Sequence, residues 1–313
     1  MSTKGVAVID LQKQLALRLG KKGTATDYTI YNRRSDEETL CLYEPTLYPE
    51  KLVSLLHCLN SSDFALLVFD GISKEIGEAM VALDMLGIQG IVCFRDGTKE
   101  EFSVLARGTS LEKFQECAYD DAAILAALEA FPAPRTPDAP LRIPLDSSFL
   151  VKSVGVVALG IVKRGVVNVH DSLTLVPSGK KASVRSLQVQ DKDVDHADAG
   201  DRVGLCLKDV NVDDLERGVE LVKENSPITS GSELEVEAEL SKFQKSGLTA
   251  GSSVLVSFGM QMSTANLPQA LELGAKGKIK LEFLKPFAYE KGAAALLVDN
   301  TRPLRILGRA RFL

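Results

Sequence analysis

Apolar and polar positions follow two alternating patterns along the first 131 residues. Short apolar runs with the length of a strand are followed by segments in which apolar residues recur every three or four positions, as on one face of a helix. The run Phe64–Phe69 is almost continuously apolar, which is typical of a strand buried on both faces of a parallel sheet. The predicted strands are Gly5–Ile9, Thr39–Tyr43, Phe64–Phe69 and Gly90–Phe94, and the predicted helices are Leu11–Leu19, Glu50–Leu59, Lys74–Leu86 and Asp120–Ala130. This order predicts an α/β domain with a parallel sheet and helices on both faces.

The pattern changes after residue 140. Short segments rich in Val and Leu are interrupted by Gly, Asp, Asn and Ser at intervals of roughly 8–12 residues, which favours β-barrels. The strands predicted for a first barrel are Val154–Val162, Ser172–Pro177, Ala182–Val189, Arg202–Leu207 and Val219–Val222. Those predicted for a second barrel are Glu233–Ser241, Ser253–Met260, Lys278–Phe283, Ala293–Val298 and Leu304–Phe312. The fold class is therefore an α/β domain followed by two all-β barrels.

Proline marks the boundary between the two patterns. Four of the ten residues 131–140 are proline, which lacks a backbone donor and biases the preceding residue to extended geometry. A weaker break, with Pro227 and Gly231, separates the two barrels. The predicted domains are an α/β domain at 1–131, a Pro-rich linker at 132–140, a barrel at 141–224 and a second barrel at 225–313.

Charge is distributed unevenly along this acidic chain. Residues 1–140 carry 14 basic and 21 acidic side chains, a net charge of −7, whereas residues 141–224 have a net charge of −1 and residues 225–313 one of +3. A net charge of −5 for the whole chain disfavours coating of DNA, so we expect no DNA partner. A local RNA-binding surface in the basic C-terminal third remains open.

Composition excludes several other classes of protein. The chain is 45% apolar and 25% charged, as globular proteins are. No apolar run approaches the ~20 residues of a membrane-spanning helix, and no signal peptide is visible at the N-terminus. The five cysteines are scattered singly, which argues against a disulfide framework or a zinc ribbon. We therefore expect a cytoplasmic protein with no membrane partner that is a monomer when free.

Residues 142–222 contain several short blocks with glycines where barrel turns and bends need them. The blocks are Val151–Gly165, His170–Pro177, Val184–Gln188, Ala197–Leu205 and Leu215–Gly218. In sequence and order they resemble the second domain of the elongation factor Tu superfamily. The stretch Leu19–Asn32 is similar to the start of archaeal SelB-like factors, including the methanogen factor once named a pyrrolysine elongation factor, EF-Pyl. The resemblance implies a Ras-like P-loop-type domain followed by two barrels, and a GTPase that works in translation.

The phosphate-binding loop of such GTPases is absent. A P-loop needs GxxxxGK(S/T) after the first strand, because its glycines let backbone N–H groups surround the phosphates and its Lys neutralises them. Here the strand Val6–Ile9 is followed by Asp10–Gln14 and then directly by a predicted helix, with no glycine between Gly5 and Gly20. Asp10 would place a negative charge where a phosphate should lie.

Three further nucleotide motifs are degraded. The DxxG that orders Mg²⁺ should follow Thr39–Leu42, but the chain continues Tyr43–Tyr48 without the Asp, the Gly or the following His. The guanine-binding NKxD is replaced by Phe94–Gly97, in which only Asp96 could accept from a guanine edge. The last guanine loop, near Cys117-Ala118, is not recognisable. Each lost charge-assisted hydrogen bond is worth ~1.5–3 kcal/mol, so we predict a pseudo-GTPase with no catalytic residue, no nucleotide cofactor and no metal.

Two other patterns that could bind a metal are weak. Asp191, Asp193, Asp195 and Asp198 look like a calcium loop, but the positions that require Gly and Glu hold His196 and Arg202. A solvated barrel loop is the favoured interpretation. The histidines His57, His170 and His196 have no ligand spacing with one another or with the cysteines.

Basic residues on predicted strand ends and turns of the barrels are the candidate contacts for RNA. In the resembled family the first barrel faces the small ribosomal subunit and also forms the aminoacyl pocket. The candidates are Lys152, Lys163, Arg164, Lys180, Lys181, Arg185, Arg302, Arg305, Arg309 and Arg311. They could equally be exposed charges without a role, and the arginines of the C-terminus could pair with the acidic first domain.

Three hypotheses follow from this combination. The first is a nucleotide-independent accessory, regulatory or hibernation-type factor that binds the ribosome, on its small-subunit side, or a tRNA. The second is an active SelB-like elongation GTPase that delivers a special aminoacyl-tRNA. The third is a scaffold that binds another protein and has no RNA role.

Overall fold

The structure is a computed structural model that describes residues 2–35, 38–132 and 136–313. The chain divides into two compact units, and each is described by itself. Unit 1 comprises Met1–Pro134 with the segments Ser241–Gln244 and Val298–Arg309, and unit 2 comprises the remainder. The predicted Pro-rich linker, 132–140, spans the junction at residues 134 and 135, and its residues 133–135 lie outside the described part of the chain.

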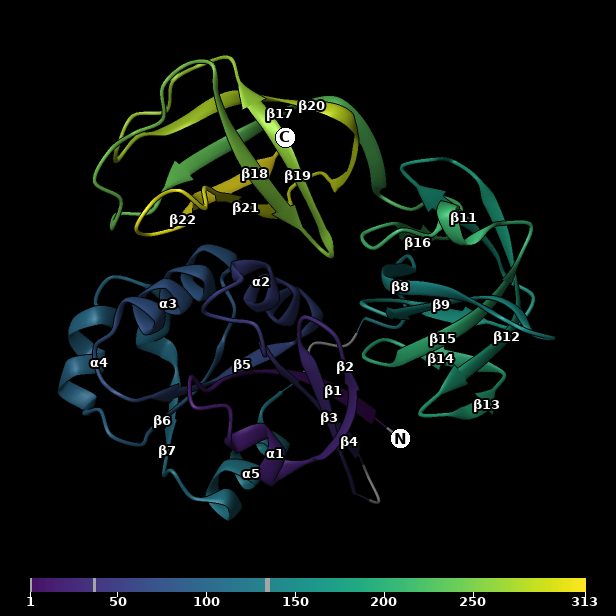
Figure 1. The fold of residues 1–313 in the computed structure, drawn as a ribbon, viewed down its shortest axis with the longest axis horizontal. Coiled ribbons are helices and arrows are strands. Elements are labelled where there is room, and N and C mark those ends of the chain that lie inside the picture. Colours follow the sequence, from purple (N-terminus) through teal and green to yellow (C-terminus); the bar gives the residue numbers. More distant parts are fainter. Residues whose placement is uncertain (1, 36–37, 133–135) are drawn as a thin grey trace. The chain divides into compact units, whose positions relative to one another are not determined.

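Unit 1 is built on a seven-stranded sheet with the order β2-β3-β4-β1-β5-β6-β7 (Figure 1). The strands are β1 (Ser2–Ile9), β2 (Lys21–Ala25), β3 (Thr29–Arg34), β4 (Glu38–Glu44), β5 (Phe64–Phe69), β6 (Gly90–Phe94) and β7 (Gln115–Cys117). Strands β4, β1, β5, β6 and β7 run parallel to one another, whereas β3 runs antiparallel to both β4 and β2.

Helices cover both faces of this sheet, as predicted. They are α1 (Leu15–Leu19), α2 (Leu52–Ser61), α3 (Lys74–Leu86), α4 (Lys99–Ala106) and α5 (Asp121–Ala130), with a short 3-10 helix at Ser110–Lys113. In Figure 1, α2 and α3 lie on one side of the sheet, and α1 and α5 lie on the other. Within the described residues, no helix combines the length and the apolar character needed to cross a membrane.

The sheet of unit 1 is mixed rather than wholly parallel, which corrects one part of the sequence prediction. Strands β2 and β3 were not expected because their burial does not alternate. All five residues of β2 are exposed, and β3 changes from buried at Thr29–Tyr31 to exposed at Arg33 and Arg34. An edge strand without a buried face leaves no hydrophobic period in the sequence.

Helix boundaries depend on local capping. Helix α3 begins and ends at the predicted residues, and the Ser73 hydroxyl accepts from the Ile76 N–H at its start. Helix α4 was missed, although Thr98 and Glu101 form a capping box in which each side chain accepts from the backbone N–H of the other. Helix α1 begins at Leu15 rather than Leu11, because the preceding residues form a turn around Asp10.

The core of unit 1 lies between the parallel strands and the helices α1 and α5. It contains Val6, Leu66 and Ile91 from the strands, against Leu15 and Leu128 from the helices. These residues are completely buried. The continuous apolar pattern of β5 therefore reflects burial on both faces of a central strand.

Unit 2 contains the two barrels. The elements of the first are β8 (Arg142–Val151), β9 (Gly155–Ile161), β10 (Val166–Asn168), β11 (Ser172–Val176), β12 (Lys181–Val189), β13 (Lys192–Val194), β14 (His196–Asp198), β15 (Arg202–Lys208), a 3-10 turn (Val212–Asp214) and β16 (Glu220–Val222). The order is β11-β16-β8-β9-β15-β12-β13, and the pairing of β11 with β12 closes the ring. Strand β8 was not predicted, because its second half, from Ser147 to Val151, is not buried.

The second barrel is closed in the order β17-β20-β19-β18-β21-β22. Its strands are β17 (Ile228–Leu240), β18 (Ser252–Phe258), β19 (Gln261–Leu267), β20 (Lys276–Glu290), β21 (Ala294–Val298) and β22 (Ile306–Phe312). The prediction of an α/β domain followed by two β-barrels is confirmed. Closure leaves no free sheet edge in this barrel.

A buried ion pair connects two strands of the first barrel and reaches the second. Arg142 on β8 donates from Nε to Glu220 Oε2 at 3.0 Å and from Nη2 to Oε1 at 2.8 Å. The Glu220 side chain is completely buried, and the Arg142 guanidinium lies 4.5 Å from the ring centre of Phe258 on β18. Such a bidentate pair has strong directional preference, and removal of one partner leaves a charge without compensation.

Substitution Glu220→Ala is expected to destabilise the protein by about 3–5 kcal/mol, because it leaves the Arg142 guanidinium buried without its carboxylate. Chemical denaturation at pH 7 measures this loss. Glu216→Ala is the matched control, since Glu216 is exposed in the loop that precedes β16. Equal stability of the two variants would contradict a structural role for the pair.

Candidate functional site

The turn after β1 is organised by the carboxylate of Asp10. Its Oδ1 accepts from the Gln12 N–H at 3.0 Å, and its Oδ2 accepts from the N–H groups of Gln14 and Leu15, each at 2.9 Å. Free N–H groups at the start of a helix form a natural site for an anion. The anion that these donors bind is a side chain of the protein itself, and only 3% of Asp10 is exposed.

Arg95 connects this turn to the neighbouring loops. The Arg95 side chain donates from Nη2 to Asp10 Oδ1 at 2.8 Å, from Nε to Asp70 Oδ1 at 2.8 Å and from Nη1 to the Tyr119 hydroxyl at 3.2 Å. Asp10, Asp70 and Arg95 each follow a parallel strand directly, and Tyr119 follows β7 two residues later. Because the carboxyl ends of parallel strands meet at one edge of a sheet, four loops converge on one guanidinium.

The charges of this cluster stabilise one another. Burial by itself would raise the pKa of Asp10, but the hydrogen bonds from Gln14, Leu15 and Arg95 outweigh burial and hold that pKa below its ordinary value. Burial likewise opposes the charge of Arg95, and its hydrogen bonds to Asp70, Asp10 and Tyr119 raise its pKa. Asp10 is therefore an anion at neutral pH.

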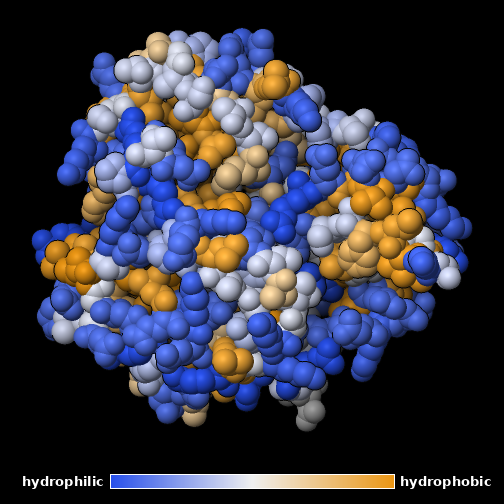
Figure 2. Space-filling view, viewed as in Figure 1, coloured by the Kyte–Doolittle hydropathy of each residue, from blue (hydrophilic) through white to orange (hydrophobic). Residues whose placement is uncertain are grey.

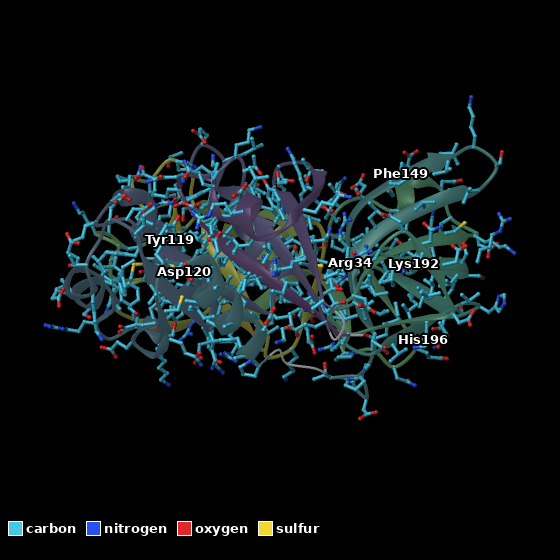
Figure 3. All side chains as sticks on the ribbon, turned by 90° about the horizontal axis from the view of Figure 1, so that it is seen from below. Arg34, Tyr119, Asp120, Phe149, Lys192 and His196 are labelled. Carbon is cyan, nitrogen blue, oxygen red and sulfur yellow. The ribbon has the colours of Figure 1, made fainter. Side chains whose placement is uncertain are left out.

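Tyr119 lies between two guanidinium groups. Arg18 of α1 and Arg95 lie 5.2 Å and 5.5 Å from the centre of its ring, and Arg18 also donates to Asp121 at the start of α5. Figure 3 labels Tyr119 beside Asp120, whose carboxylate caps α5 by accepting from the N–H of Ala122 at 3.0 Å. Cation–π contacts and ion pairs thus connect α1, α5 and the loop after β6.

Glu44 ends β4 at the same edge of the sheet. It is 3% exposed, and its Oε2 accepts from the Tyr31 hydroxyl at 3.3 Å. Its Oε1 has no hydrogen-bond partner among the described residues. Burial raises the pKa of Glu44 above its ordinary value, and the charge of Asp10 adds to this effect. Both factors favour the protonated acid.

The chemistry available at this edge is that of a cluster whose charges are already paired. The donors of the first turn hold Asp10, and the guanidinium holds two carboxylates. A phosphate that entered the turn would have to displace a carboxylate whose negative charge repels it. Of the residues that the guanine motif would require, only Asp96 is present, and it is exposed.

The patterns that could suggest a metal site are spread over the fold. Among the residues that the structure describes, no three His, Cys, Asp or Glu side chains are grouped as metal ligands would be. His57 pairs with Asp27 at 2.7 Å, and His196 is exposed on the first barrel (Figure 3). Asp191, Asp193 and Asp195 are exposed on the turn and strand around β13.

Two basic candidates of the first barrel come together at the β8–β9 turn. Lys152 is exposed in this turn, and Arg185 of β12 donates to the Val154 carbonyl at 2.7 Å. The exposed apolar side chains Phe149 and Leu150 precede the turn. On the face drawn in Figure 2, apolar surface gathers over the first barrel. Cations beside apolar side chains form a surface suited to a partner with both phosphates and apolar groups.

The other basic candidates of the first barrel differ in their environment. Lys180 pairs with Asp214, and Lys181 is exposed at the start of β12. Arg164 donates to Glu290 at 2.8 Å and to the Pro140 carbonyl at 3.0 Å. Lys163 is half-buried, and its backbone N–H donates to the Arg142 carbonyl. Arg164 thus already has a structural partner within unit 2.

The C-terminal arginines also differ in their environment. Within unit 1, Arg305 donates from Nε to Glu78 Oε1 at 3.0 Å, and the Glu78 side chain of α3 is almost completely buried. Arg302 lies 3.4 Å from Asp299. Arg309 and Arg311 alternate along β22, where Arg309 is half-buried and Arg311 is exposed. The roles of these arginines as RNA contacts remain predictions. Arg305 pairs with an acidic residue of the first domain, Glu78, which is the alternative considered for the C-terminal arginines.

The sequence pointed to Asp10 but not to Arg95, Asp70, Tyr119 or Glu44. A signal was present, because Asp70, Arg95 and Glu44 are charged residues directly at the ends of buried strands. Only the order of the strands in the sheet shows that these ends are neighbours.

Comparison with known proteins identifies relatives of the whole chain and of its parts. The family of elongation factor Tu domain 2 matches residues 155–221. The uncharacterised protein MJ0325 of Methanocaldococcus jannaschii is 36% identical over 293 residues, which cover 93% of each chain. The selenocysteine-specific elongation factor of the same organism is 25% identical over 264 residues, 77% of this chain and 56% of that factor.

Other relatives share only part of their length with this chain. Elongation factor 1-alpha of Natronomonas pharaonis is 35% identical over 101 residues, and the match covers 24% of that protein. The fold is shared with the crystal structure of translation elongation factor SelB from Methanococcus maripaludis in complex with the GTP analogue GppNHp. The TM-score is 0.83 at 20% identity, covering 100% of this chain and 79% of that one.

Substitution Asp10→Ala is expected to destabilise the protein by about 3–5 kcal/mol at pH 7, because it leaves three N–H groups and part of Arg95 without an acceptor. Because the pKa of Asp10 is lowered in the folded state, its carboxylate contributes fully to the free energy of unfolding above the pKa of an unfolded Asp. This contribution is lost as the pH falls through the pKa of Asp10 in the folded state. The difference between the variant and the wild type should therefore shrink in acid. Urea unfolding at several pH values measures it, with the exposed Asp96→Ala as control.

Substitution Glu44→Gln is expected to raise the melting temperature near neutral pH. Because the pKa of Glu44 is raised in the folded state, the folded protein loses stability as the pH rises. The loss begins near the pKa of an unfolded Glu, about 4.3, and continues through the pKa of Glu44 in the folded state. The advantage of the amide should therefore grow between about pH 4 and pH 8. A thermal melt series, with the exposed Glu50→Gln as control, tests this. An unchanged difference across that range would show that Glu44 is not a buried neutral acid.

Proposed function

Because the chain belongs to the same family as protein MJ0325 of Methanocaldococcus jannaschii, within the elongation factor Tu superfamily, we propose that it is a translation factor that works without GTP. It would bind the ribosome, on the side of the small subunit, or a tRNA, as an accessory, regulatory or hibernation-type factor in the cytoplasm. Its similarity to SelB and to elongation factor 1-alpha favours a role in translation.

The observation that carries the proposal is the Asp10 carboxylate in the turn after β1. A P-loop presents its N–H groups and a Lys to phosphates, and in this chain those N–H groups hold an internal anion paired with Arg95. The sequence also lacks the Mg²⁺-ordering and guanine-binding motifs. These features together support a pseudo-GTPase.

Without a γ-phosphate, the ordering and release of switch segments that drive a GTPase cycle have no trigger. The factor would therefore occupy its site according to its concentration and affinity, and would leave without hydrolysis. The first barrel supplies the surface that supports binding, since Lys152 and Arg185 lie together beside exposed apolar side chains.

Sedimentation with archaeal ribosomes through sucrose tests this function. We expect binding that is identical with and without GTP and that weakens as salt increases, because phosphate contacts release counterions. Binding only with GTP would support an active SelB-like GTPase that delivers a special aminoacyl-tRNA. Absence of binding to ribosomes and to tRNA in all conditions would contradict the proposal and favour a protein-binding scaffold.

The double substitution Lys152→Glu and Arg185→Glu is expected to weaken ribosome binding by about tenfold or more at moderate salt and to reduce the salt slope by about 2. The matched control is Lys192→Glu with Lys278→Glu, which changes the net charge equally at two other exposed positions. Equal loss in both double variants would show a general charge effect rather than a binding surface at the β8–β9 turn.

A further inference from the structure

Basic residues are concentrated in one short segment of the otherwise acidic first domain. Residues 13–34 contain six basic side chains and one acidic side chain, although residues 1–140 have a net charge of −7. The six are Lys13, Arg18, Lys21, Lys22, Arg33 and Arg34. Four of them belong to the β2–β3 hairpin, and we call Lys21, Lys22, Arg33 and Arg34 the basic hairpin.

The basic hairpin forms one lateral edge of the sheet of unit 1. Strand β2 is the last strand in the order of the sheet, and it pairs with β3 so that Lys21 lies opposite Asn32 and Lys22 opposite Tyr31. Side chains of a strand alternate between the two faces, so Lys22 shares a face with Arg33, and Lys21 shares the other face with Arg34. The two rows of cations therefore flank the same exposed edge.

The side chains of this edge are accessible. All residues of β2 are exposed, as are Arg33 and Arg34, and Figure 3 labels Arg34 at the end of β3. Arg33 donates to the Leu19 carbonyl at 3.4 Å, which holds it against the end of α1. In the part of the chain that the structure describes, no carboxylate forms an ion pair with Lys21 or Lys22. Their charges are therefore available to a partner.

The chemistry of the edge selects the class of partner. Cations on both faces suit a ligand with two rows of negative charge, such as the two backbones that border a groove of a nucleic-acid duplex. Binding of single strands relies on exposed aromatic rings that stack on bases. The two tyrosines of the hairpin, Tyr28 and Tyr31, are buried at 1% and 6% exposure and present no such ring.

We propose that the basic hairpin binds the phosphodiester backbone of double-stranded RNA, without reading its sequence. The choice of RNA rather than DNA rests on the proposed function in translation, while the phosphate chemistry rests on the hairpin itself. This surface lies on β2 and β3, on strands of unit 1, and is separate in the chain from Lys152 and Arg185 of the first barrel.

Lysines on an exposed edge strand have a second physical use, because they prevent the pairing of that edge with another chain. The two roles give different results when charge is reversed. A protective edge that is changed to glutamate stays charged and repels other copies as before, whereas a phosphate-binding edge loses its ligand.

Fluorescence anisotropy tests the proposal with the full chain and a labelled RNA duplex of about 20 base pairs. This duplex is longer than the ~16 base pairs that one double-stranded-RNA-binding domain covers. The double substitution Lys21→Glu and Lys22→Glu is expected to weaken binding by about tenfold or more at moderate salt, with a salt slope reduced by about 2. The matched control, Lys51→Glu with Lys113→Glu, makes the same charge change at exposed positions elsewhere in this domain and should change binding much less.

Parallel titrations compare the affinity for the RNA duplex with the affinities for three other polyanions. These are a DNA duplex and single-stranded RNA of the same sequence, and polyglutamate. Preference for the RNA duplex supports the proposal. Stronger binding of single strands or of polyglutamate, or equal affinity of the hairpin and control variants for the RNA duplex, would overturn it. Ribosome sedimentation of the wild type separates this result from the proposed function. Wild-type binding to ribosomes together with unchanged duplex binding of the hairpin variant would exclude the hairpin and leave the proposed function standing.

Discussion

The ion pair between Asp10 and Arg95 is the interaction on which the α/β unit depends. Asp10 follows β1, the strand between β4 and β5, and its carboxylate satisfies the N–H groups that begin α1. Arg95 then holds the loop after β5 through Asp70 and the loop after β7 through Tyr119. The edge of the sheet at which ligands bind in open α/β folds thereby holds charged groups that are paired with one another. A buried charge without its partner costs several kcal/mol, so these residues depend on one another.

This constraint has a consequence for conformational change. In nucleotide-dependent switches, contacts to a γ-phosphate order loops that relax after hydrolysis. Here the loops after β1, β5 and β6 are joined by the side chains of Asp10, Asp70 and Arg95. These groups are part of the chain and, unlike a γ-phosphate, are not released. Within the same unit, the pair of Arg305 with buried Glu78 joins the segment 298–309 to α3. Both features favour a single arrangement of unit 1, which agrees with a factor that binds without a nucleotide cycle.

The two surfaces that we propose for partners are formed by other elements than this edge of the sheet. The β8–β9 turn presents Lys152 and Arg185 beside apolar side chains, and the basic hairpin presents two rows of cations at the lateral edge of the first sheet. The two surfaces differ in chemistry, because the hairpin has no exposed aromatic or large apolar side chain. They are therefore separable by mutation, each with its own salt dependence.

The sequence by itself determined the fold class and the nature of the first turn. The fold class is encoded locally, in continuous apolar runs such as Phe64–Phe69, in periodic helices such as Lys74–Leu86 and in the regular turns after residue 140. The absence of glycine between Gly5 and Gly20 is likewise visible without a structure. The tertiary structure decided which charged residues meet. Arg95 is 85 residues from Asp10, and no periodicity relates them, because their proximity follows from the order of parallel strands. The same holds for the basic hairpin, since a strand without a buried face has no hydrophobic pattern and becomes an edge only through pairing with β3.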